Sequence, residues 1–289
     1  MKKKVNRIYE KEFKNKTVLI TGGAGSLGSV LTKRILDFPV KSVRVLDINE
    51  YALFKLGREI KDKRLRLLLG SILDKERIEM AGFGADIIIH SAAVKNIEIS
   101  EFNPIETVDV NVNGTINLIK MSIRNKPKKF LNVSSDKATE SSTLYGSTKQ
   151  LSEKVISWAG THFKETKFAS ARFGNMMETK GNVFEIWNEE SKMKKPLSIT
   201  DPSMKRYFFH VNEAVDFILK CILLMNAGEI FVPKMKSYKI IDLAKKISKK
   251  HRVIGLRQGE KLNEVLISDV EKESSKETKD MWVIRPYSI

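Results

Sequence analysis

Tyr145 and Lys149 are the residues whose types and spacing first indicate chemistry. They lie four positions apart, so on a helix their side chains would share one face, a single turn apart. A lysine charge at that distance favours the phenolate form of a tyrosine, whose phenol titrates at about pH 10 when free. Such a pair can act as a base near neutral pH, whereas the competing interpretation is a solvated helix face with no chemistry.

A second set of polar residues precedes this pair. Ser134, Ser135, Asp136 and Lys137 follow residues 130–133, an apolar stretch that predicts a buried strand. The acid and the amine would therefore lie at the end of that strand, close to the helix that carries the tyrosine. Together the four ionisable side chains form a candidate general acid/base set rather than a single base.

A glycine-rich turn predicts a dinucleotide-binding site. Residues 17–20 have the composition of a buried strand, and residues 21–28 continue it with the turn T-G-G-A-G-S-L-G. Apolar residues at helical spacing follow. A G-x-x-G-x-x-G motif indicates a dinucleotide site when it lies between a strand and a helix, as it does here. Gly22, Gly25 and Gly28 would allow a tight turn and a close approach of a pyrophosphate to the helix N-terminus.

Two further features bear on the cofactor. The second strand, residues 42–46, ends in Asp47, about twenty residues past the glycine turn. A carboxylate there accepts hydrogen bonds from a ribose and repels a 2′-phosphate, which favours NAD over NADP. The alternative is an aspartate that caps the helix beginning near residue 49.

After the fourth strand, the small residues of Ser91-Ala92-Ala93 would let the backbone lie against a cofactor.

The alternation of elements predicts an α/β fold with a doubly wound parallel Rossmann sheet. Beyond Asn175 the pattern loosens, and the remaining segments suggest a smaller C-terminal, mostly helical substrate lobe. We therefore predict a dinucleotide-binding Rossmann domain over residues 1–175 and the substrate lobe over residues 176–289, with some chain crossing back to the sheet. The predicted strands are 17–20, 42–46, 65–70, 86–90, 130–133 and 167–172, and the lobe segments are 184–187, 213–225, 230–232, 240–247 and 261–266.

Composition narrows the class of protein. The chain has 289 residues, 42% hydrophobic and 30% charged, which is typical of a folded enzyme and not of a disordered chain. The single cysteine, Cys221, excludes an internal disulfide and a cysteine-based metal site, and its apolar surroundings indicate buried packing. The four histidines share no metal-ligand spacing, so we expect no metal.

The net charge of +17 permits nucleic-acid or membrane-surface binding, and it equally suits an anionic small substrate. Because the lysines are spread along the chain without an interleaved aromatic patch, we expect no nucleic-acid partner. Charges interrupt every apolar run, and the basic N-terminus precedes no apolar segment, so we expect neither membrane insertion nor a signal peptide. The predicted location is the cytoplasm.

Seven motifs occur in an order that resembles a known family. They are T-G-G-A-G-S-L-G, H-S-A-A-V-K, S-S-D-K, Y-G-S-T-K, R-F-G-N, I-T-D-P-S-M-K-R and G-L-R-Q-G-E-K-L-N-E. Together they resemble the extended short-chain dehydrogenase/reductase superfamily and, within it, the UDP-N-acetylglucosamine 4,6-dehydratases of the polysaccharide-biosynthesis and flagellin-glycosylation group. The resemblance covers about residues 15–270, and the run beginning at Gly255 is its most specific part.

The resemblance implies a reaction and a role for each catalytic residue. Tyr145, assisted by Lys149, would take the proton of the sugar 4-hydroxyl during oxidation at C4. The ketone acidifies C5–H, which Lys137 would remove as a neutral amine, while Asp136 would protonate the leaving 6-hydroxyl and Ser135 would hydrogen-bond nearby. The dinucleotide would return its hydride to C6, giving a UDP-4-keto-6-deoxy-N-acetylhexosamine.

The resemblance also implies two sets of binding residues and a homo-oligomeric assembly. The residues expected to bind NAD, or alternatively NADP, are Gly22, Gly25, Ser26, Leu27, Gly28, Asp47, Ser71, Ile72, Ala92, Ala93, Lys95, Tyr145, Lys149 and Met176. The residues expected to bind the UDP-N-acetylhexosamine substrate are Lys95, Asn175, Arg206, Arg257 and Glu260, whose arginine forks suit a diphosphate.

Departures from the family pattern leave some points open. Tyr145 resembles the branch that inverts C5, whereas Asp47 with Glu50 is closer to the retaining branch, so the product configuration is not determined. Ser71 stands where the family usually has an aspartate near the adenine. Two other functions compete with dehydration. A UDP-sugar C4 epimerase would use Tyr145 and Lys149 but not Lys137, and a dinucleotide-sensing or nucleic-acid-binding protein would use no acid/base set.

Overall fold

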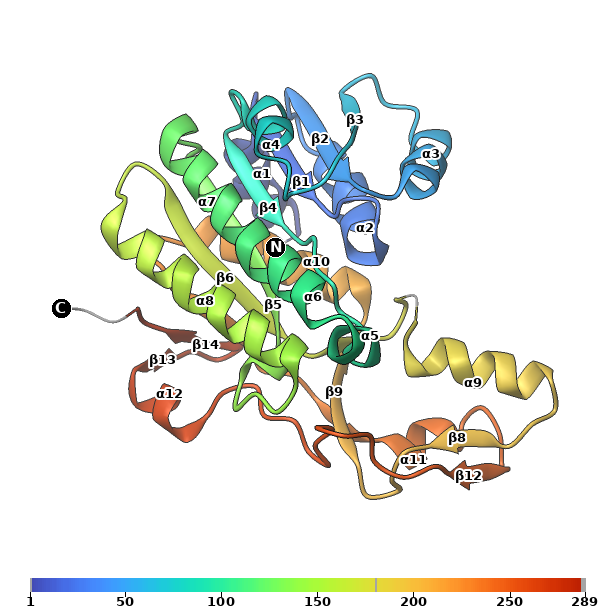
Figure 1. Ribbon diagram of the computed structural model, residues 1–289. Coiled ribbons are helices and arrows are strands. Elements are labelled where there is room, and N and C mark those ends of the chain that lie inside the picture. Colours follow the sequence, from blue (N-terminus) through green and yellow to red (C-terminus); the bar gives the residue numbers. More distant parts are fainter. Residues whose placement is uncertain (1, 180, 287–289) are drawn as a thin grey trace.

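The computed structural model describes residues 2–179 and 181–286 of the chain (Figure 1). A large sheet occupies the centre, and a smaller lobe lies beside one end of it. The elements of the first 175 residues are α1 (Lys2–Phe13), β1 (Thr17–Thr21), α2 (Ser26–Leu36), β2 (Ser42–Asp47), α3 (Glu50–Glu59), β3 (Leu65–Leu69), α4 (Lys75–Gly82), β4 (Ile87–His90), α5 (Ile97–Phe102), α6 (Pro104–Val108), the π-helix η1 (Asp109–Asn113), α7 (Gly114–Asn125), β5 (Lys129–Ser135), the 3₁₀ turn η2 (Asp136–Ala138), α8 (Leu144–His162) and β6 (Lys167–Phe173).

The later residues divide between the lobe and the sheet. Their elements are β7 (Asn175–Met176), α9 (Val183–Lys192), β8 (Leu197–Ile199), β9 (Lys205–Phe209), α10 (Val211–Leu224), β10 (Ile230–Pro233), β11 (Ser237–Lys239), α11 (Ile240–Ala244), β12 (His251–Val253), α12 (Asp269–Glu273), β13 (Ser275–Glu277) and β14 (Met281–Ile284).

Within the described residues, nine strands form one sheet in the order β13-β14-β10-β6-β5-β4-β1-β2-β3. Pairing is parallel from β3 through β10, and only β14 and β13 run antiparallel to their neighbours. The order reverses direction at β1 and β4, which is where dinucleotides bind in sheets of this kind. This topology confirms the predicted doubly wound parallel fold.

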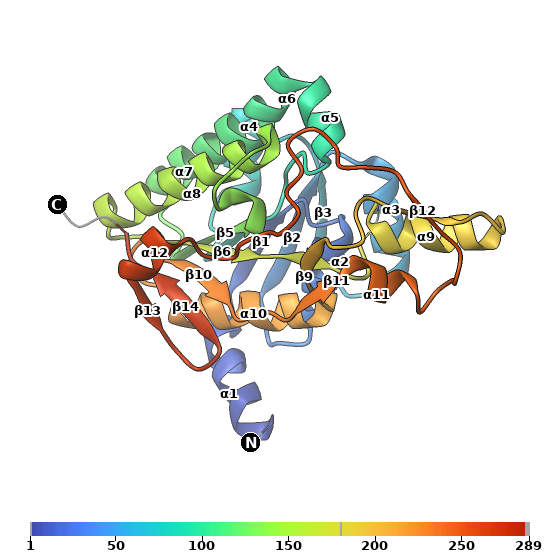
Figure 2. The same ribbon diagram turned by 90° about the horizontal axis from the view of Figure 1, so that it is seen from below.

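Helices cover both faces of the sheet (Figures 1 and 2). One core cluster packs α2, α3 and α10 on one face, and a second packs α4, α7 and α8 on the other. The central strands are therefore buried on both sides, which explains their nearly continuous apolar sequences. Cys221 lies in the first cluster and is fully buried, as its apolar surroundings predicted.

The smaller lobe contains α9, α11 and short strands around the buried side chain of Trp187 (Figure 1). Strands β11, β9 and β7 form a small sheet, and β12 pairs with β8. Residues 213–225 and 230–232 were expected in this lobe, but they belong to the main sheet. Both segments are strongly apolar, so α10 packs on one face of the sheet and β10 pairs with β6 to extend it. Residues 261–266 form no helix, since Lys205 of β9 holds the carbonyl of Leu262 at 3.0 Å in an extended chain.

A buried ion-pair network joins the end of the chain to the sheet. Arg172 on β6 is 1% exposed and donates to both carboxylate oxygens of Glu153 on α8, at 3.0 and 2.6 Å. It also donates to Glu271 of α12 at 2.7 and 2.9 Å, to Thr139 at 2.8 Å and to the carbonyl of Leu266 at 3.1 Å. Since a buried guanidinium needs partners for its donors, this network fixes the chain that leads into α12.

Glu271→Gln should lower the free energy of unfolding at neutral pH by about 1–3 kcal/mol, because Arg172 loses one of two charged acceptors. Burial alone would raise the pKa of Glu271, but Arg172 and the bonds from Ser268 hold that pKa below its ordinary value of 4.5. A carboxylate with a lowered pKa stabilises the fold above about pH 4.5 and loses this effect as the pH falls. Denaturant unfolding at pH 7 and pH 3.5 should therefore show that Glu271→Gln is less stable than the unmodified protein at pH 7, and that this difference in the free energy of unfolding is smaller at pH 3.5.

The matched control is Glu273→Gln, which makes the same chemical change on the exposed side of α12 and should leave stability unchanged. A Glu271→Gln protein as stable as the Glu273→Gln control at pH 7 would contradict the role given to the network.

Candidate active site

A groove of about 640 Å³ runs along the carboxyl ends of β1, β2 and β4. The glycine turn forms its floor: a Cβ added at Gly22 would lie 2.7 Å from the backbone of Ala92, and one at Gly28 would lie 2.5 Å from the carbonyl of Gly22. A side chain is therefore excluded at these two positions, and the N-terminus of α2 opens onto the groove. These features fit a dinucleotide pyrophosphate. Every residue predicted to bind the cofactor lines this groove: Gly22, Gly25, Ser26, Leu27, Gly28, Asp47, Ser71, Ile72, Ala92, Ala93, Lys95, Tyr145, Lys149 and Met176.

Asp47 braces the turn while it faces the groove. One carboxylate oxygen accepts from the backbone N–H of Ala24, and the other accepts from that of Asn49, both at 3.0 Å. The cap of α3 is Asn49 itself, whose side chain accepts from Ala52 at 2.9 Å. The alternative role of Asp47 as the helix cap is therefore wrong, and the carboxylate retains lone pairs for a ligand.

Tyr145 and Lys149 lie on one face of α8 and both border the groove. Burial lowers the pKa of Lys149 to about 8, and its amine donates to the carbonyl of Val133 at 2.6 Å. The pKa of Tyr145 is raised, because burial outweighs the charge of Lys137 and a hydrogen bond with Ser135. The expectation that Lys149 stabilises the Tyr145 phenolate is not met in this arrangement, since the lysine points at the strand carbonyl.

Asn111 is a residue of this site that the sequence analysis did not identify. The π-helix η1 carries it, and its side chain accepts from the N–H of Val94 at 2.8 Å and donates to the carbonyl of the same residue at 2.9 Å. It also donates to Thr148 of α8 at 3.0 Å. Asn111 thus holds the groove segment 91–95 at a fixed distance from the catalytic helix. The π-helix, which often marks functional positions, gave no signal in the sequence pattern.

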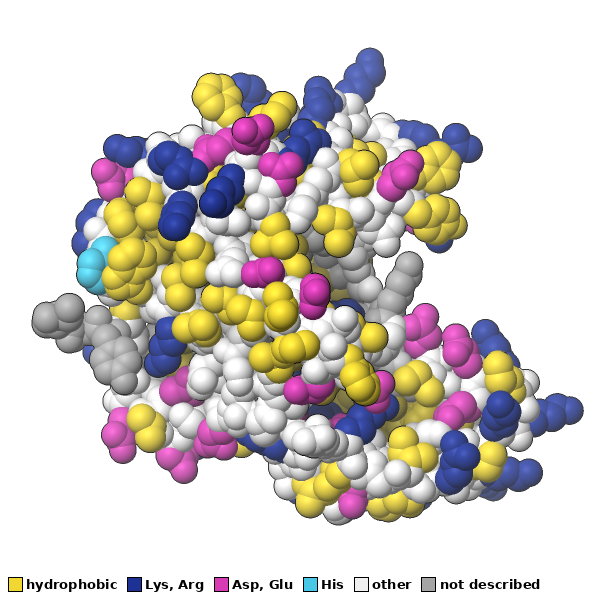
Figure 3. Space-filling view, viewed as in Figure 1, with side chains coloured by type: hydrophobic (Ala, Val, Ile, Leu, Met, Phe, Trp, Pro, Cys, Tyr) yellow, Lys and Arg dark blue, Asp and Glu magenta, His cyan; other side chains and the backbone are white. Residues whose placement is uncertain are grey.

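A second cavity, of about 360 Å³, adjoins the groove and lies between the sheet and the lobe. The space-filling view shows the molecule hollowed between these two parts, beside α9 (Figure 3). Ser135, Tyr145, Lys95 and Met176 border both spaces, so they mark the junction where a substrate could meet a cofactor. Burial lowers the pKa of Lys95 at this junction. All residues predicted to bind the substrate line the second cavity: Lys95, Asn175, Arg206, Arg257 and Glu260.

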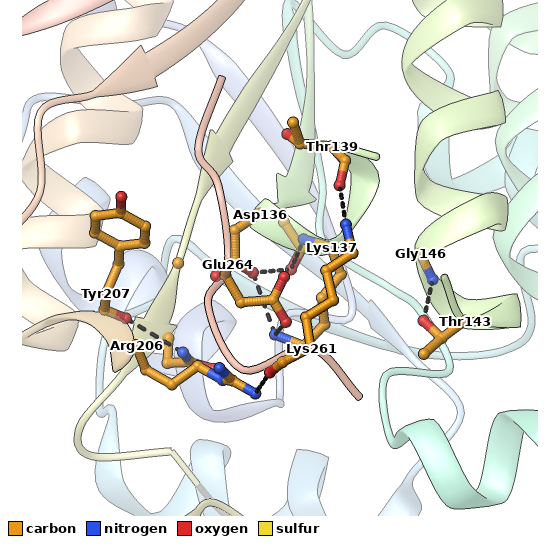
Figure 4. Close-up of polar contacts among 12 residues, drawn as sticks. Asp136, Lys137, Thr139, Thr143, Gly146, Arg206, Tyr207, Lys261 and Glu264 are labelled. Atoms are coloured by element: carbon orange, nitrogen blue, oxygen red, sulfur yellow. Dashed lines mark hydrogen bonds and ion pairs between the residues drawn. The ribbon is translucent and has the colours of Figure 1, made fainter. Parts of the chain in front are cut away.

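Lys137 projects into this cavity from η2 (Figure 4). Its amine lies 3.3 Å from a carboxylate oxygen of Asp136 and 3.7 Å from one of Glu264. Burial and Arg206 lower the pKa of Lys137, but the two carboxylates, with Tyr145, raise it overall. The resting amine is therefore protonated, which corrects the expectation of a neutral amine: the sequence placed Asp136 beside it but not the second carboxylate.

The side chains of Asp136 and Lys137 meet at 3.3 Å, but only that of Lys137 lines the second cavity. The side chain of Asp136 is 1% exposed and does not border either cavity in the described part of the chain. Its Oδ1 accepts from Ser135 at 2.9 Å, while its Oδ2 is buried without a hydrogen-bond partner among the described residues. The aspartate thus lies behind the serine, and any exchange with a substrate would pass through Ser135 or Lys137.

Residues 254–267, here called the C-terminal loop, cover the mouth of the second cavity. Lys261 donates to the carbonyl of Glu140, and Ser142 donates to that of Gly259 at 2.6 Å. Arg206 donates to the carbonyl of Lys261 at 2.7 Å. Several contacts therefore close the loop over residues 139–143.

The two residues of the C-terminal loop that were predicted to bind the substrate, Arg257 and Glu260, have protein partners. Arg257 pairs with Glu98 of α5 at 2.9 Å, and Glu260 approaches Arg206 at 3.4 Å. The guanidinium of Arg257 is thus held by the far wall of the cavity and not by Glu260. A diphosphate would exchange places with Glu98, an exposed partner whose pairing costs little to break.

The chain is similar to known proteins over most of its length. The family profile described as "Polysaccharide biosynthesis protein" matches residues 18–286. The UDP-N-acetylglucosamine 4,6-dehydratase (inverting) of Campylobacter jejuni is 35% identical, covering 95% of this chain and 84% of its own. The X-ray structure of Pen from Bacillus thuringiensis superimposes with a TM-score of 0.90 at 34% identity, covering 94% of this chain and 88% of that one.

Other relatives carry different names. An uncharacterized membrane protein of Methanocaldococcus jannaschii is 38% identical, covering 96% of this chain and 88% of its own. In the described residues of the present chain, no helix combines the length and apolarity of a membrane span. The UDP-glucose 4-epimerase of Rickettsia rickettsii is 33% identical, covering 94% of this chain and 83% of its own. The relatives therefore include both dehydratases and epimerases.

Proposed function

The chain belongs to the polysaccharide biosynthesis protein family, and from that membership we propose that it dehydrates UDP-N-acetylglucosamine to a UDP-4-keto-6-deoxy-N-acetylhexosamine. The observation that carries the proposal is the amine of Lys137 in the second cavity, beside Tyr145 and the groove. Oxidation at C4 needs one base. Loss of water also needs a base at C5 and an acid at the 6-hydroxyl, and Lys137 with its carboxylates supplies both kinds of group.

The chemistry that a bound nicotinamide dinucleotide supplies is reversible hydride transfer, out of C4 and back to C6. Tyr145 takes the proton of the 4-hydroxyl, with its ring fixed by burial at the junction of the two spaces. Lys137 takes the C5 proton once the 4-ketone has acidified it. Arg206, Arg257 and Lys95 supply positive charge around the cavity, which suits the diphosphate of a nucleotide-sugar.

Incubation with UDP-N-acetylglucosamine and NAD, followed by mass spectrometry and NMR of the product, tests the proposal. We expect a product lighter by one water with a C6 methyl group. Since the Campylobacter relative is named an inverting enzyme, we propose inversion at C5, which the proton coupling constants of the product will reveal.

A C4 epimerase is the second candidate, because the Rickettsia relatives bear that name. An epimerase would return a product of unchanged mass from UDP-glucose or UDP-N-acetylglucosamine. Unchanged mass with an inverted C4 would replace the proposed function, and no turnover of any UDP-sugar would refute both candidates.

Asp47→Asn should shift the ratio of the NAD and NADP dissociation constants by about 10-fold toward NADP, because it removes the charge that repels a 2′-phosphate. The amide oxygen can still accept from Ala24, so the turn keeps its brace. Calorimetric titration of both dinucleotides measures the ratio, and Asp37→Asn at the exposed end of α2 is the control. Tighter NADP than NAD binding by the unmodified protein would contradict our assignment of NAD as the preferred cofactor.

A further inference from the structure

Glu264 is a second carboxylate beside Lys137, and it faces the substrate cavity. Its side chain is 6% exposed and lies 3.7 Å from the amine. It lines the second cavity, whereas Asp136 does not border that space. In Figure 4, dashed lines join the amine of Lys137 to the carboxylates of Asp136 and Glu264. The carboxylate that a bound sugar would meet is therefore the glutamate.

Two anchors in the C-terminal loop hold Glu264 in this position. On one side, Lys205 and Arg206 of β9 donate to the carbonyl of Leu262, both at 3.0 Å. On the other side, Leu266 is buried, and Thr139 donates to its carbonyl at 3.2 Å, as Arg172 does at 3.1 Å. Because the chain is hydrogen-bonded on both sides of Glu264, the fold holds this side chain at the cavity.

The other carboxylate is poorly placed for the same task. Asp136 already accepts from Ser135 at 2.9 Å and from Lys137 at 3.3 Å through one oxygen. Its second oxygen is enclosed beside Gly174, where an added Cβ would lie 3.3 Å from it. A 6-hydroxyl in the cavity could reach this carboxylate only after the serine or the lysine moved aside.

We propose that Glu264 exchanges a proton with Lys137 and that it, instead of Asp136, gives the proton to the leaving 6-hydroxyl. The inference rests on the proposed dehydration and assigns one of its steps. In the structure the two groups form an ion pair of ammonium and carboxylate at 3.7 Å. Transfer of one proton between them yields an amine and a carboxylic acid of the same total charge.

The elimination then balances. The amine takes the C5 proton, the C5–H electron pair forms the C5=C6 bond, and the C6–O bond breaks with its electron pair on oxygen. The acid of Glu264 protonates that oxygen, and water leaves. Lys137 ends as an ammonium and Glu264 as a carboxylate, so the elimination restores the resting ion pair without help from solvent.

The first test needs no substrate. The side-chain ammonium of Lys137, assigned by its loss in Lys137→Ala, can be titrated by NMR in the whole protein and in Glu264→Gln. The charges that face it are those of Asp136, Glu264, Arg206 and Tyr145. Loss of one carboxylate should lower its midpoint by at least about 1 pH unit, and Glu273→Gln should leave it unchanged. An unchanged midpoint in Glu264→Gln would overturn the pairing.

The second test separates the steps of turnover. In Glu264→Gln, the absorbance of reduced dinucleotide should still appear, while water loss should slow by about 100-fold or more. Glu264→Asp keeps the acid on a shorter side chain and should recover part of the rate of water loss. The same variant provides the test if Glu264→Gln does not fold. Water loss at the rate of the Glu273→Gln control would overturn the role in elimination.

The two tests keep the inference distinct from the proposed function. If the unmodified protein dehydrates no UDP-sugar, the proposed function fails and the elimination role fails with it, while the titration still decides whether Glu264 and Lys137 share a proton. If dehydration occurs and Asp136→Asn, not Glu264→Gln, removes water loss alone, the proposed function stands and the inference is wrong.

Discussion

Tyr145→Phe is expected to abolish both reduction of the bound dinucleotide and loss of water, with turnover reduced by about 1,000-fold or more. The substitution removes one oxygen from a ring that is 9% exposed, so the packing of α8 should survive. No other residue at the junction of groove and cavity carries a phenol, within the part of the chain described. Because C4 oxidation comes first, its loss stops every later step.

The pH dependence of this first step should also report on Tyr145. Burial raises its pKa above the ordinary value of 10.0, so the phenol is protonated at neutral pH and the rate of C4 oxidation should rise with pH. The positive charge of an oxidised nicotinamide would oppose the burial effect. Single-turnover absorbance measured from pH 6 to 9 tests the slope, with the exposed Tyr51→Phe as the control. Oxidation at C4 by Tyr145→Phe would show that another base serves this step.

Much of the fold was predictable because its signals are local. The glycine turn, the apolar strands and the Tyr145–Lys149 spacing each lie within a few residues, and each determines its own conformation. The carboxyl ends of parallel strands then meet at one edge, which brings residues 22–28, 47 and 91–95 into one groove without further information.

The parts that sequence reasoning missed depend on contacts between distant residues. Thr139 and Leu266 are 127 positions apart, and their contact is part of what brings Glu264 to Lys137. Burial lowers the pKa of Lys137, while Asp136 and then Glu264 raise it, and the pattern around Ser135 could indicate only the first of these carboxylates. Glu264 is the last residue of the run G-L-R-Q-G-E-K-L-N-E. The presence of a second acid in this run was the one feature of the sequence that could have indicated its role.

The different surroundings of Asp136, which is buried, and Lys137, which lines the cavity, have a similar cause. The 3₁₀ turn η2 begins where β5 ends, and Ser135 caps it by accepting from the N–H of Lys137. This turn sends one side chain into the protein and the next into the cavity. Adjacent residues in an expected strand or loop give no hint of that split, and the sequence predicted only that both lie at the end of the strand.

Lys137→Ala is the second substitution with a large expected effect, and it should separate the two halves of the reaction. Water loss should fall by about 1,000-fold or more, because no other amine in the described chain lies between the carboxylates of Asp136 and Glu264. Oxidation at C4 should continue, since Tyr145 is unchanged. Reduced dinucleotide would then accumulate to about one equivalent per active site.

The substitution also removes the cation that lies 3.3 Å from the carboxylate of Asp136 and 3.7 Å from that of Glu264. Breaking a buried ion pair in this way costs about 3–5 kcal/mol of stability, so the variant should melt earlier at pH 7. Because protonation of either acid removes the repulsion between the two, lowering the pH should narrow the gap to the unmodified protein. Thermal melts at pH 7 and pH 5 test this, and Lys272→Ala, an exposed lysine with one carboxylate partner, is the matched control.

An added primary amine distinguishes lost chemistry from lost structure. Propylamine can enter the space left by the lysine stem and should restore part of the water loss, whereas an amide of the same size should not. If Lys137→Ala dehydrates the sugar at the rate of the Lys272→Ala control, the base at C5 is a different group. The cavity between sheet and lobe would then bind the nucleotide-sugar, but Lys137 would take no part in the elimination of water.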